Sequence, residues 1–388
     1  MKRRDFIGSL GAMALSGGLH GCAAPSSAPS RGVGGGRLYG ALLHLGGNMW
    51  SDRPHPLPAD DRRRFPFPDY LTKAEIEKNK FAHSMGGKAD RLRFDEGVWR
   101  RVTTRMADLG MTFVMIDIGE GFRYPSHPEI AAKDAWDADK MARELERLRS
   151  MGLTPVPKLN FSTTHSAWMG EMRRKTSSPE YYRFVSEVIC DVCEVFRPEY
   201  FHIGYDEEDE AHQFGYVDKV VRDDETWWHD LLFTVREVER RGVRAWMWSD
   251  KIWHCRDEFV KRCPRSVLQS NWYYLDDFSP KESLDPRHKA SLYPMVHAYE
   301  WLDVAGFDQV PTTSCCGNWG LLTTNPRLTA AYVSKHVGAS RLKGLMMAPW
   351  FLTMGPFEAD ILKGLDQTVP AVELLGWNAE SAAQLGSV

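Results

Sequence analysis

One arrangement of apolar and polar residues recurs along the chain from residue 38 onward. The arrangement begins with a short apolar stretch that ends in polar or aromatic residues. A longer stretch, with apolar residues at helical spacing, then separates this short stretch from the next short one. The first pattern is typical of a buried strand and the second of an amphipathic helix. Eight strands are predicted in this way, at residues 37–47, 110–120, 152–162, 199–207, 242–250, 266–274, 308–318 and 343–351.

The alternation of these strands with helices predicts the fold class. Helical patterns precede the second to fifth strands, and another follows the eighth, at residues 96–109, 137–151, 181–196, 228–241 and 357–377. Gly110, Gly152 and Gly242 stand where helices should end, as glycine commonly does. We therefore expect an α/β fold, a single (β/α)8 TIM barrel over residues 38–378.

The first 22 residues have the order of a bacterial export signal. Arg3 and Arg4 precede an apolar stretch and resemble a twin-arginine signal. Cys22 stands where a lipoprotein signal places its lipidated cysteine. We expect an exported protein, either periplasmic or attached to a membrane through a lipid on Cys22.

Three further segments flank or interrupt the predicted barrel. Residues 23–37 are rich in Ala, Pro, Ser and Gly, which is typical of a flexible linker. Residues 48–98 form an insertion, rich in proline and charge, that could fold over the barrel mouth. Residues 379–388 are a C-terminal tail.

Side chains alternate along a strand, and barrel active sites lie at the C-terminal strand ends. In the fourth strand the apolar residues are expected to face the helices, which places His202 and Asp206 inside, with Asp206 at the mouth. Glu207 begins the loop and could also turn inward. The acidic residues that follow, 208–210, are predicted to form a solvated loop.

The same alternation brings further polar and aromatic groups to the mouth. A cleft of carboxylates and indole rings suits a sugar, which has apolar faces and a rim of hydroxyl groups. For each tryptophan alone, the alternative is a place in the barrel core. The groups collected are Asp117, Asn160, Trp248, Asp250, Trp272 and Trp350.

Composition excludes some classes of function. A net charge of −3 and the absence of a basic patch argue against nucleic acid as a partner. Cys190 and Cys193 form a C-x-x-C motif, but a structural zinc site needs a second pair, so burial as small apolar residues is the favoured interpretation. We expect neither a metal nor a cofactor.

Several of these residues also match a known family. "HIGYDE", residues 202–207, resembles the His-x-Gly-Gly-Asp-Glu signature of family 20 glycoside hydrolases, the β-N-acetylhexosaminidases. "PVPKLNFSTTHSAW", residues 155–168, is similar to the family's Pro-Glu-Ile-Asp-Met-Pro-Gly-His segment, with Asn160 at the Asp and His165 at the His. "WMWSD", residues 246–250, resembles the family's fifth-strand motif.

The resemblance implies a barrel enzyme that acts on glycans or glycoconjugates. Glu207 would protonate the leaving glycosidic oxygen, and Asp206 would orient the substrate's own 2-acetamido group as it attacks the anomeric carbon. The other matching positions would line the pocket or support it by hydrogen bonds: Trp248, Trp272 and Trp350 around the sugar, and His165 and His202 beside the acids.

The sequence departs from the family pattern at several of these positions. Tyr205 replaces the second glycine, Lys158 and Asn160 replace acids of the third strand, and the first strand has no arginine to grip sugar hydroxyls. The seventh strand has Cys315, Cys316 and Asn318 where the family holds the acetamido group with Tyr and Asp.

Three classes of function therefore stay open. The leading one is an exported glycosidase of β-linked N-acetylhexosamine, with a glycosidase for a different sugar as its variant. The second is a non-catalytic glycan-binding lipoprotein on the same barrel. The third is a metal-dependent hydrolase with His202, Asp206, His212 and Asp250 as ligands.

Overall fold

The computed structural model describes residues 36–52, 85–87, 89–213, 215–279, 286–317 and 320–377. Within them, parallel strands form one eight-stranded sheet in the order β8-β7-β6-β5-β4-β1-β12-β9. The strands are β1 (Leu38–His44), β4 (Phe113–Asp117), β5 (Thr154–Lys158), β6 (Tyr200–His202), β7 (Arg244–Trp248), β8 (Leu268–Ser270), β9 (Thr312–Thr313) and β12 (Gly344–Met347).

The two ends of this sheet meet, so the sheet closes into a barrel. Parallel bridges join Gln269 to Gln309 and Trp272 to Thr312. The backbone N–H of Thr312 donates to the carbonyl of Asn271 at 2.9 Å. Each of the eight predicted strands contains one strand of the barrel, so the predicted (β/α)8 fold is confirmed.

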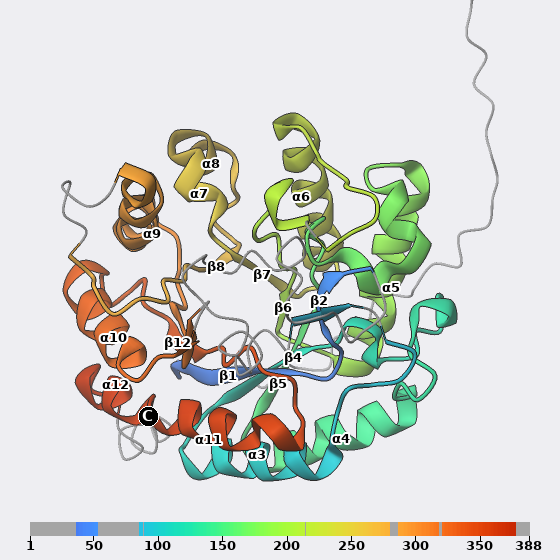
Figure 1. Cartoon of the computed structure of the whole chain (residues 1–388), viewed down its shortest axis with the longest axis horizontal. Coiled ribbons are helices and arrows are strands. Elements are labelled where there is room, and N and C mark those ends of the chain that lie inside the picture. The colour runs from blue at the N-terminus through green and yellow to red at the C-terminus, as the bar shows by residue number, and fades with distance from the viewer. Residues whose placement is uncertain are drawn as a thin grey trace, which may run out of the picture. The chain divides into compact units, whose positions relative to one another are not determined.

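Helices surround the strands on the outside of the barrel (Figure 1). They are α3 (Glu96–Asp108), α4 (Ala138–Ser150), α5 (Pro179–Phe196), α6 (Asp224–Glu239), α7 (Lys251–His254), α8 (Arg256–Arg262), α9 (Pro286–Val304), α10 (Asn325–His336), α11 (Glu358–Asp366) and α12 (Val369–Leu374). The single helical pattern expected over 357–377 is thus divided into α11 and α12.

Local sequence explains where the longer helices begin and end. α3, α4, α5 and α6 each start after a residue whose side-chain oxygen accepts a hydrogen bond from the first helical turn, namely Asp95, Asp137, Ser178 and Asp223. The predicted stop signals Gly110, Gly152 and Gly242 have φ of 70°, 81° and 74°, the left-handed region that glycine adopts without strain.

The core has two layers, as the alternation of side chains predicts. Inside the barrel, an apolar cluster includes Met115 of β4 and Trp246 of β7. Between strands and helices, a larger cluster includes Ile116 of β4, Phe201 of β6 and Ile203 just beyond it. The residues between these outward positions therefore point into the barrel. Near the C-terminal ends of the strands, these inward-facing residues are polar.

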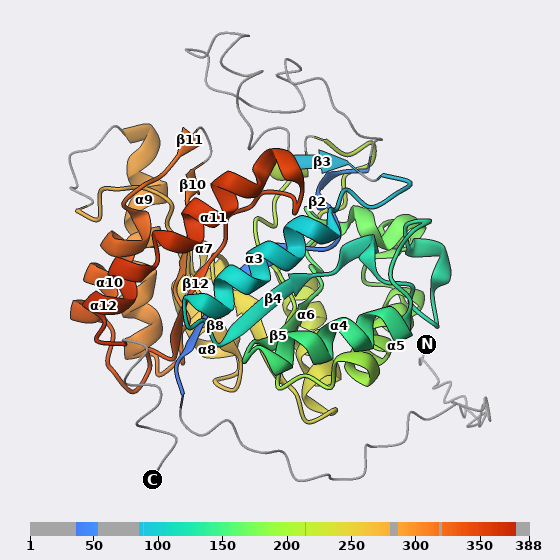
Figure 2. The same ribbon diagram turned by 90° about the horizontal axis from the view of Figure 1, so that it is seen from below.

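Two short strands from the predicted insertion form a separate small sheet. β2 (Asn48–Ser51) pairs with β3 (Met85–Gly87), and both lie at the upper end of the molecule in Figure 2. A second small sheet pairs β10 (Cys316–Gly317) with β11 (Gly320–Leu321).

Several expectations concern residues outside those described. These are the export signal at 1–22, the linker up to residue 35, the tail at 379–388, and residues 53–84 of the insertion. Among the described helices, none combines the length and the apolar character needed to span a bilayer.

Candidate active site

The acid pair, Asp206 and Glu207, lies in the loop that follows β6. The backbone conformation at the start of this loop requires a glycine at position 204. Gly204 has φ of +75°, and a Cβ atom there would come within 2.0 Å of Asn160 Oδ1. Tyr205 and Glu207 also have positive φ, of 71° and 51°. Such conformations cost about 1–3 kcal/mol each for non-glycine residues, and they concentrate at functional sites.

Asp206 is buried and held by two side chains of the loop after β5. Asn160 Nδ2 donates to Asp206 Oδ1 at 2.7 Å, and His165 Nε2 lies 3.3 Å from Asp206 Oδ2. Burial by itself would raise the pKa of Asp206, but the charges of His165 and Lys158 and the hydrogen bonds from His165 and Asn160 hold it well below its usual range. Asp206 is therefore an anion across the physiological pH range.

Glu207 shares the same histidine. His165 Nε2 lies 3.2 Å from Glu207 Oε2, so one ring nitrogen faces both carboxylates. Burial alone would lower the pKa of His165, but Asp206 and Glu207 outweigh burial and raise it to about 10. His165 is thus a buried cation that holds the two acids together.

The backbone of Glu207 is fixed by Asp250, which follows β7. The N–H of Glu207 donates to Asp250 Oδ2 at 2.8 Å. Burial and the charge of Asp206 raise the pKa of Asp250 well above its usual range. Asp250 therefore orients the loop, and it is absent from the residues that line the pocket.

A second histidine also lies near Glu207. His212 Nε2 lies 3.8 Å from Glu207 Oε1, and its Nδ1 lies 2.7 Å from Asp209 Oδ2. Burial would lower the pKa of His212, but the hydrogen bond to Asp209 and the charge of Glu207 raise it to about 9. The ring of Trp50, in β2, contacts the ring of His165 edge-on at 4.6 Å between centroids, so the insertion reaches the acid site.

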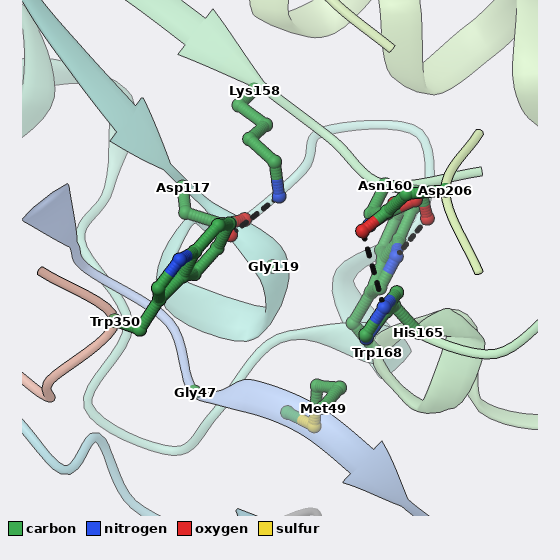
Figure 3. Close-up of a pocket in the computed structure, with 10 residues that line it drawn as sticks. All are labelled: Gly47, Met49, Asp117, Gly119, Lys158, Asn160, His165, Trp168, Asp206 and Trp350. Carbon is green, nitrogen blue, oxygen red and sulfur yellow. Dashed lines mark hydrogen bonds and ion pairs between the residues drawn. The ribbon is translucent and has the colours of Figure 1, made fainter. Parts of the chain in front are cut away.

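A small pocket, partly open to solvent, lies beside these groups (Figure 3). One wall has Asn160, His165 and Asp206, and the wall across from it has Asp117 and Lys158. Lys158 Nζ donates to Asp117 Oδ2 at 2.6 Å. The complete lining is Gly47, Met49, Asp117, Gly119, Lys158, Asn160, His165, Trp168, Asp206 and Trp350.

The three predicted tryptophans lie at different depths. Trp350 lines the pocket, and its positive φ of 60° marks a third strained residue at the barrel mouth. Trp248 is buried behind it, with 5.7 Å between the ring centroids. Trp272 stacks on Tyr274 and, like Trp248, is not among the lining residues. Trp350 is therefore the tryptophan among these three that can contact a ligand in this pocket.

His202 lies below the pocket inside the barrel. It is fully buried, and its Nδ1 accepts a hydrogen bond from the N–H of Gly204 at 3.2 Å. Burial lowers the pKa of His202 well below its usual range, so it stays neutral. His202 thus supports the turn that carries the acids.

The predicted set of metal ligands is not brought together in the described structure. The group whose ligand atoms lie within 4.8 Å of one another consists of His165, Asp206 and Glu207, and it lacks His202 and Asp250. Histidine and carboxylate atoms at 3.2–3.3 Å are equally the geometry of hydrogen-bonded ion pairs.

One expectation about the acidic loop is wrong. Asp209 and Glu210 are exposed, but the Glu208 side chain is only 8% exposed. Arg222 explains this difference, because its Nε and Nη2 donate to Glu208 Oε1 at 2.9 and 2.5 Å. The buried guanidinium of Arg222 offsets the cost of burying the Glu208 carboxylate. Arg222 lies 14 residues after Glu208, and no local sequence pattern predicts that the two side chains pair.

The structure shows where some residues that depart from the family pattern lie relative to the pocket. The Tyr205 ring points away from the pocket, as the alternation predicts, and its hydroxyl lies 2.9 Å from Thr234 Oγ1 on α6. Cys315 and Cys316 are buried, with exposures of 1% and 2%, and are absent from the pocket lining. Asn318 lies outside the described residues.

The lining residues missed from the sequence include Trp168 and Met49. The indole Nε1 of Trp168 donates to the carbonyl of Asn160 at 2.8 Å, which turns Trp168 toward the acids. Its spacing of three residues after His165 in a helical turn is a signal that could have identified it. Met49 comes from β2, and no local pattern connects that strand with the barrel mouth.

Comparison with solved structures identifies the fold. A β-N-acetylhexosaminidase from Bacteroides fragilis is 11% identical, with a TM-score of 0.53 over 85% of this chain and 65% of that chain. Enzymes of the same name from Streptomyces coelicolor and Streptomyces plicatus are each 12% identical, with TM-scores of 0.50 over 88% of this chain and 70% and 69% of theirs. This chain has the barrel fold of the family 20 β-N-acetylhexosaminidases.

The expected resemblance is therefore confirmed at the level of the fold. The chain spans about half to two thirds of the length of several solved structures that it matches. No protein-family model matches the sequence, and no curated protein sequence does.

Proposed function

We propose that this protein is an exported glycoside hydrolase that removes terminal β-linked N-acetylhexosamine from glycans. The observation that carries the proposal is the consecutive pair Asp206 and Glu207 at the end of β6, joined by His165 at 3.3 and 3.2 Å. The pair stands at the mouth of a barrel, where catalytic residues of this architecture lie. Asp206 and Trp350 line a common pocket, which offers both charge and an aromatic face to a sugar.

The proposed reaction divides the work between the two acids. Glu207 gives a proton to the glycosidic oxygen as the bond to the anomeric carbon breaks. The acetamido oxygen of the substrate attacks that carbon, and anionic Asp206 orients the amide and stabilises its developing positive charge. Water then opens the cyclic intermediate, with Glu207 taking the proton back, so that the product keeps the β configuration.

The supporting side chains give each acid a distinct environment. Asn160 fixes one oxygen of Asp206 at 2.7 Å, which leaves the carboxylate plane defined. Asp250 holds the backbone of Glu207 at 2.8 Å. Effective acid catalysis depends on this kind of positioning, because small displacements of the reacting groups lower the rate strongly.

The test is hydrolysis of a panel of 4-nitrophenyl glycosides by the protein without residues 1–36. The panel contains β-N-acetylglucosaminide, β-N-acetylgalactosaminide and β-glucoside, and the variant is Asp206→Asn. We expect hydrolysis of the N-acetyl sugars alone, retention of the β anomer by NMR, and a loss of roughly 10²–10⁴-fold in kcat for Asp206→Asn.

Other outcomes separate the alternatives. Hydrolysis of the glucoside would keep the glycosidase and discard the acetamido mechanism. Binding of N-acetyl sugars without turnover of short or long glycans would favour a glycan-binding protein. Activity that requires a divalent ion and disappears with a chelator would favour the metal-dependent hydrolase.

Export and lipid attachment belong to the same proposal. The motif at Arg3 and Arg4 and the position of Cys22 support a signal that ends in lipidation. Expression of the full chain and of Cys22→Ser in a bacterium, followed by fractionation and mass spectrometry, tests this. We expect the wild type in the membrane fraction with acylated Cys22, and the variant outside that fraction. An intact N-terminus in the cytoplasm would contradict export.

A further inference from the structure

Trp50 of β2 contacts the two histidines that lie beside Glu207. Its indole meets the ring of His165 edge-on, with 4.6 Å between the centroids and 87° between the planes, and its centroid lies 6.1 Å from that of His212. His165 Nε2 lies 3.2 Å from Glu207 Oε2, and His212 Nε2 lies 3.8 Å from Glu207 Oε1. Each oxygen of the proposed acid therefore has a histidine beside it, and one indole contacts both histidines.

The strand that carries Trp50 is tied to the chain that follows the acid loop. On one side of Trp50, Ser51 Oγ donates to the carbonyl of Gly215 at 2.6 Å. On the other side, the hydroxyl of Tyr216 donates to the carbonyl of Met49 at 3.0 Å. Hydrogen bonds at both neighbours of Trp50 thus fix the backbone from which its indole extends.

Packing matters for His165 because its ion pairs do not by themselves fix the ring. Both acids face the same atom, His165 Nε2. A ring held at one nitrogen can still tilt about that atom, and the distances to the two carboxylates then change. Functional side chains keep a productive geometry when neighbouring groups lock their rotamers. The stiff, flat indole of Trp50 restricts this tilt, and it adds no charge to the site.

His212 needs a packing contact for a different reason, because its ion pairs are weak restraints. Its side chain is 39% exposed, and its partner Asp209, at 2.7 Å, is 50% exposed. Water competes for both groups of such a pair. The distance of 3.8 Å to Glu207 exceeds that of a hydrogen bond. The contact with Trp50 is therefore a restraint on His212 that solvent does not screen.

Trp50 lies beside the pocket and is not among the residues that line it. Met49, the preceding residue, lines the pocket together with His165 (Figure 3). Trp50 is absent from that lining. An effect of Trp50 on a ligand in this pocket would therefore pass through His165.

We infer that Trp50 is a positioning residue for acid catalysis, which holds the rings of His165 and His212 beside the two oxygens of Glu207. The inference rests on the proposed function for the role of Glu207. Small displacements of a reacting group lower the rate strongly, so the histidines must stay in place while the proton is transferred. The first strand of the insertion would then serve catalysis, although it belongs to a sheet separate from the barrel.

Two substitutions separate the ring of Trp50 from its apolar character. Trp50→Phe keeps a flat ring, and Trp50→Leu keeps only an apolar side chain. Tyr293→Leu is the control, because the ring of Tyr293 lies 4.1 Å from that of His297, which pairs with Glu300 at 3.3 Å, and none of the three lines the pocket.

Two measurements are made on the full chain and on each variant. The first is kcat and KM for 4-nitrophenyl β-N-acetylglucosaminide. The second does not depend on turnover: NMR follows the exchange with water of the proton on His165 Nε2, whose signal is assigned by its absence from His165→Gln.

We expect Trp50→Leu to lower kcat roughly 10- to 100-fold and to leave KM within about threefold of the wild type. The His165 proton should exchange about tenfold faster or more in this variant, because the ring opens to solvent more often. Trp50→Phe should stay within about threefold of the wild type in both measurements. Tyr293→Leu should behave as the wild type does.

The outcomes distinguish this inference from the proposed function. Faster exchange in Trp50→Leu, beside a wild type that hydrolyses none of the sugars, would support the positioning of His165 and overturn the glycosidase. Hydrolysis by the wild type, with unchanged kcat or unchanged exchange in Trp50→Leu, would retain the enzyme and overturn the inference.

Two further results would also overturn the inference. A rise in KM alone would show that Trp50 contacts the sugar itself. Equal losses in Trp50→Phe and Trp50→Leu would show that a flat ring is not what matters. If circular dichroism shows that Trp50→Leu does not fold, Trp50→Met carries the same test, because its flexible side chain fills the space without a ring.

Discussion

Two clusters of charge meet at the loop after β6, and they differ in whether their residues line the pocket. The inner cluster has His165 between Asp206 and Glu207, and His165 and Asp206 line the pocket. In the outer cluster, Arg222 joins Glu208 to Asp230 with both acids buried. Glu207 and Glu208 are adjacent in sequence, yet one belongs to each cluster.

The outer cluster is buried and lies outside the pocket lining, which favours a structural role. Arg222 donates to Glu208, to Asp230 Oδ2 at 2.9 Å and to the carbonyl of Phe161 at 3.1 Å. Its guanidinium also lies 5.1 Å from the ring centre of Tyr205. Arg222 therefore contacts the residues on either side of the acid pair, Tyr205 and Glu208.

Removal of the outer cation should produce the largest change in stability. Arg222→Met leaves Glu208 and Asp230 buried without a partner, so we expect the free energy of unfolding to fall by about 3–5 kcal/mol. Arg101→Met is the matched control, because Arg101 also pairs with a carboxylate, Glu358, at 2.6 Å but is 59% exposed. Its loss of stability should be far smaller, because solvent screens an exposed pair. Equal losses in urea unfolding would contradict the structural role of the outer cluster.

A smaller effect is expected from the turn that separates the clusters. Gly204→Ala adds a Cβ within 2.0 Å of Asn160 Oδ1 on a backbone with φ of +75°. We expect a loss of about 2–4 kcal/mol and weakened activity, because Asn160 must leave Asp206. Gly242→Ala has φ of +74° but no atom within 4 Å, so it should show the backbone cost alone, about 1 kcal/mol. Identical thermal midpoints for the two variants would refute the close contact.

A third effect is the pH dependence that the inner cluster contributes to stability. The folded pKa of His165, about 10, lies above the unfolded value of about 6.5. Its stabilising contribution is therefore complete below about pH 6.5 and is lost as the pH rises toward 10, by at most about 1.4 kcal/mol per unit. The difference in unfolding free energy between wild type and His165→Gln should shrink from pH 6 to pH 9.5. A difference that grows over this range would show that His165 is neutral when folded.

The fold could be predicted because its signals are local. Short apolar stretches marked the strands, and the glycines at 110, 152 and 242 marked helix ends. The short strands β6, β8 and β9, of two or three residues each, were correctly placed but overextended. Each of these strands ends where the chain leaves the sheet to form a loop at the barrel mouth. The hydrophobic pattern does not indicate that point.

The residues of the candidate site could be predicted where the alternation of side chains along a single strand determines which residues point inward. Asp117, Asn160 and Asp206 were placed at the mouth in this way, and all three line the pocket. Trp248 and Trp272 share the inward phase but lie outside the lining, because alternation gives direction and not depth. Pairings between distant elements, such as Glu208 with Arg222, had no local signal.

The most direct test of the division between the clusters uses the adjacent residues Glu207 and Glu208. Glu207→Gln and Glu208→Gln are compared for hydrolysis of 4-nitrophenyl β-N-acetylglucosaminide and for urea unfolding. We expect Glu207→Gln to lose roughly 10²–10⁴-fold in kcat with little change in stability. Glu208→Gln should lose about 1–3 kcal/mol of stability and stay within about tenfold of wild-type kcat while folded. The reverse pattern, with catalysis lost at Glu208 and stability at Glu207, would contradict the account.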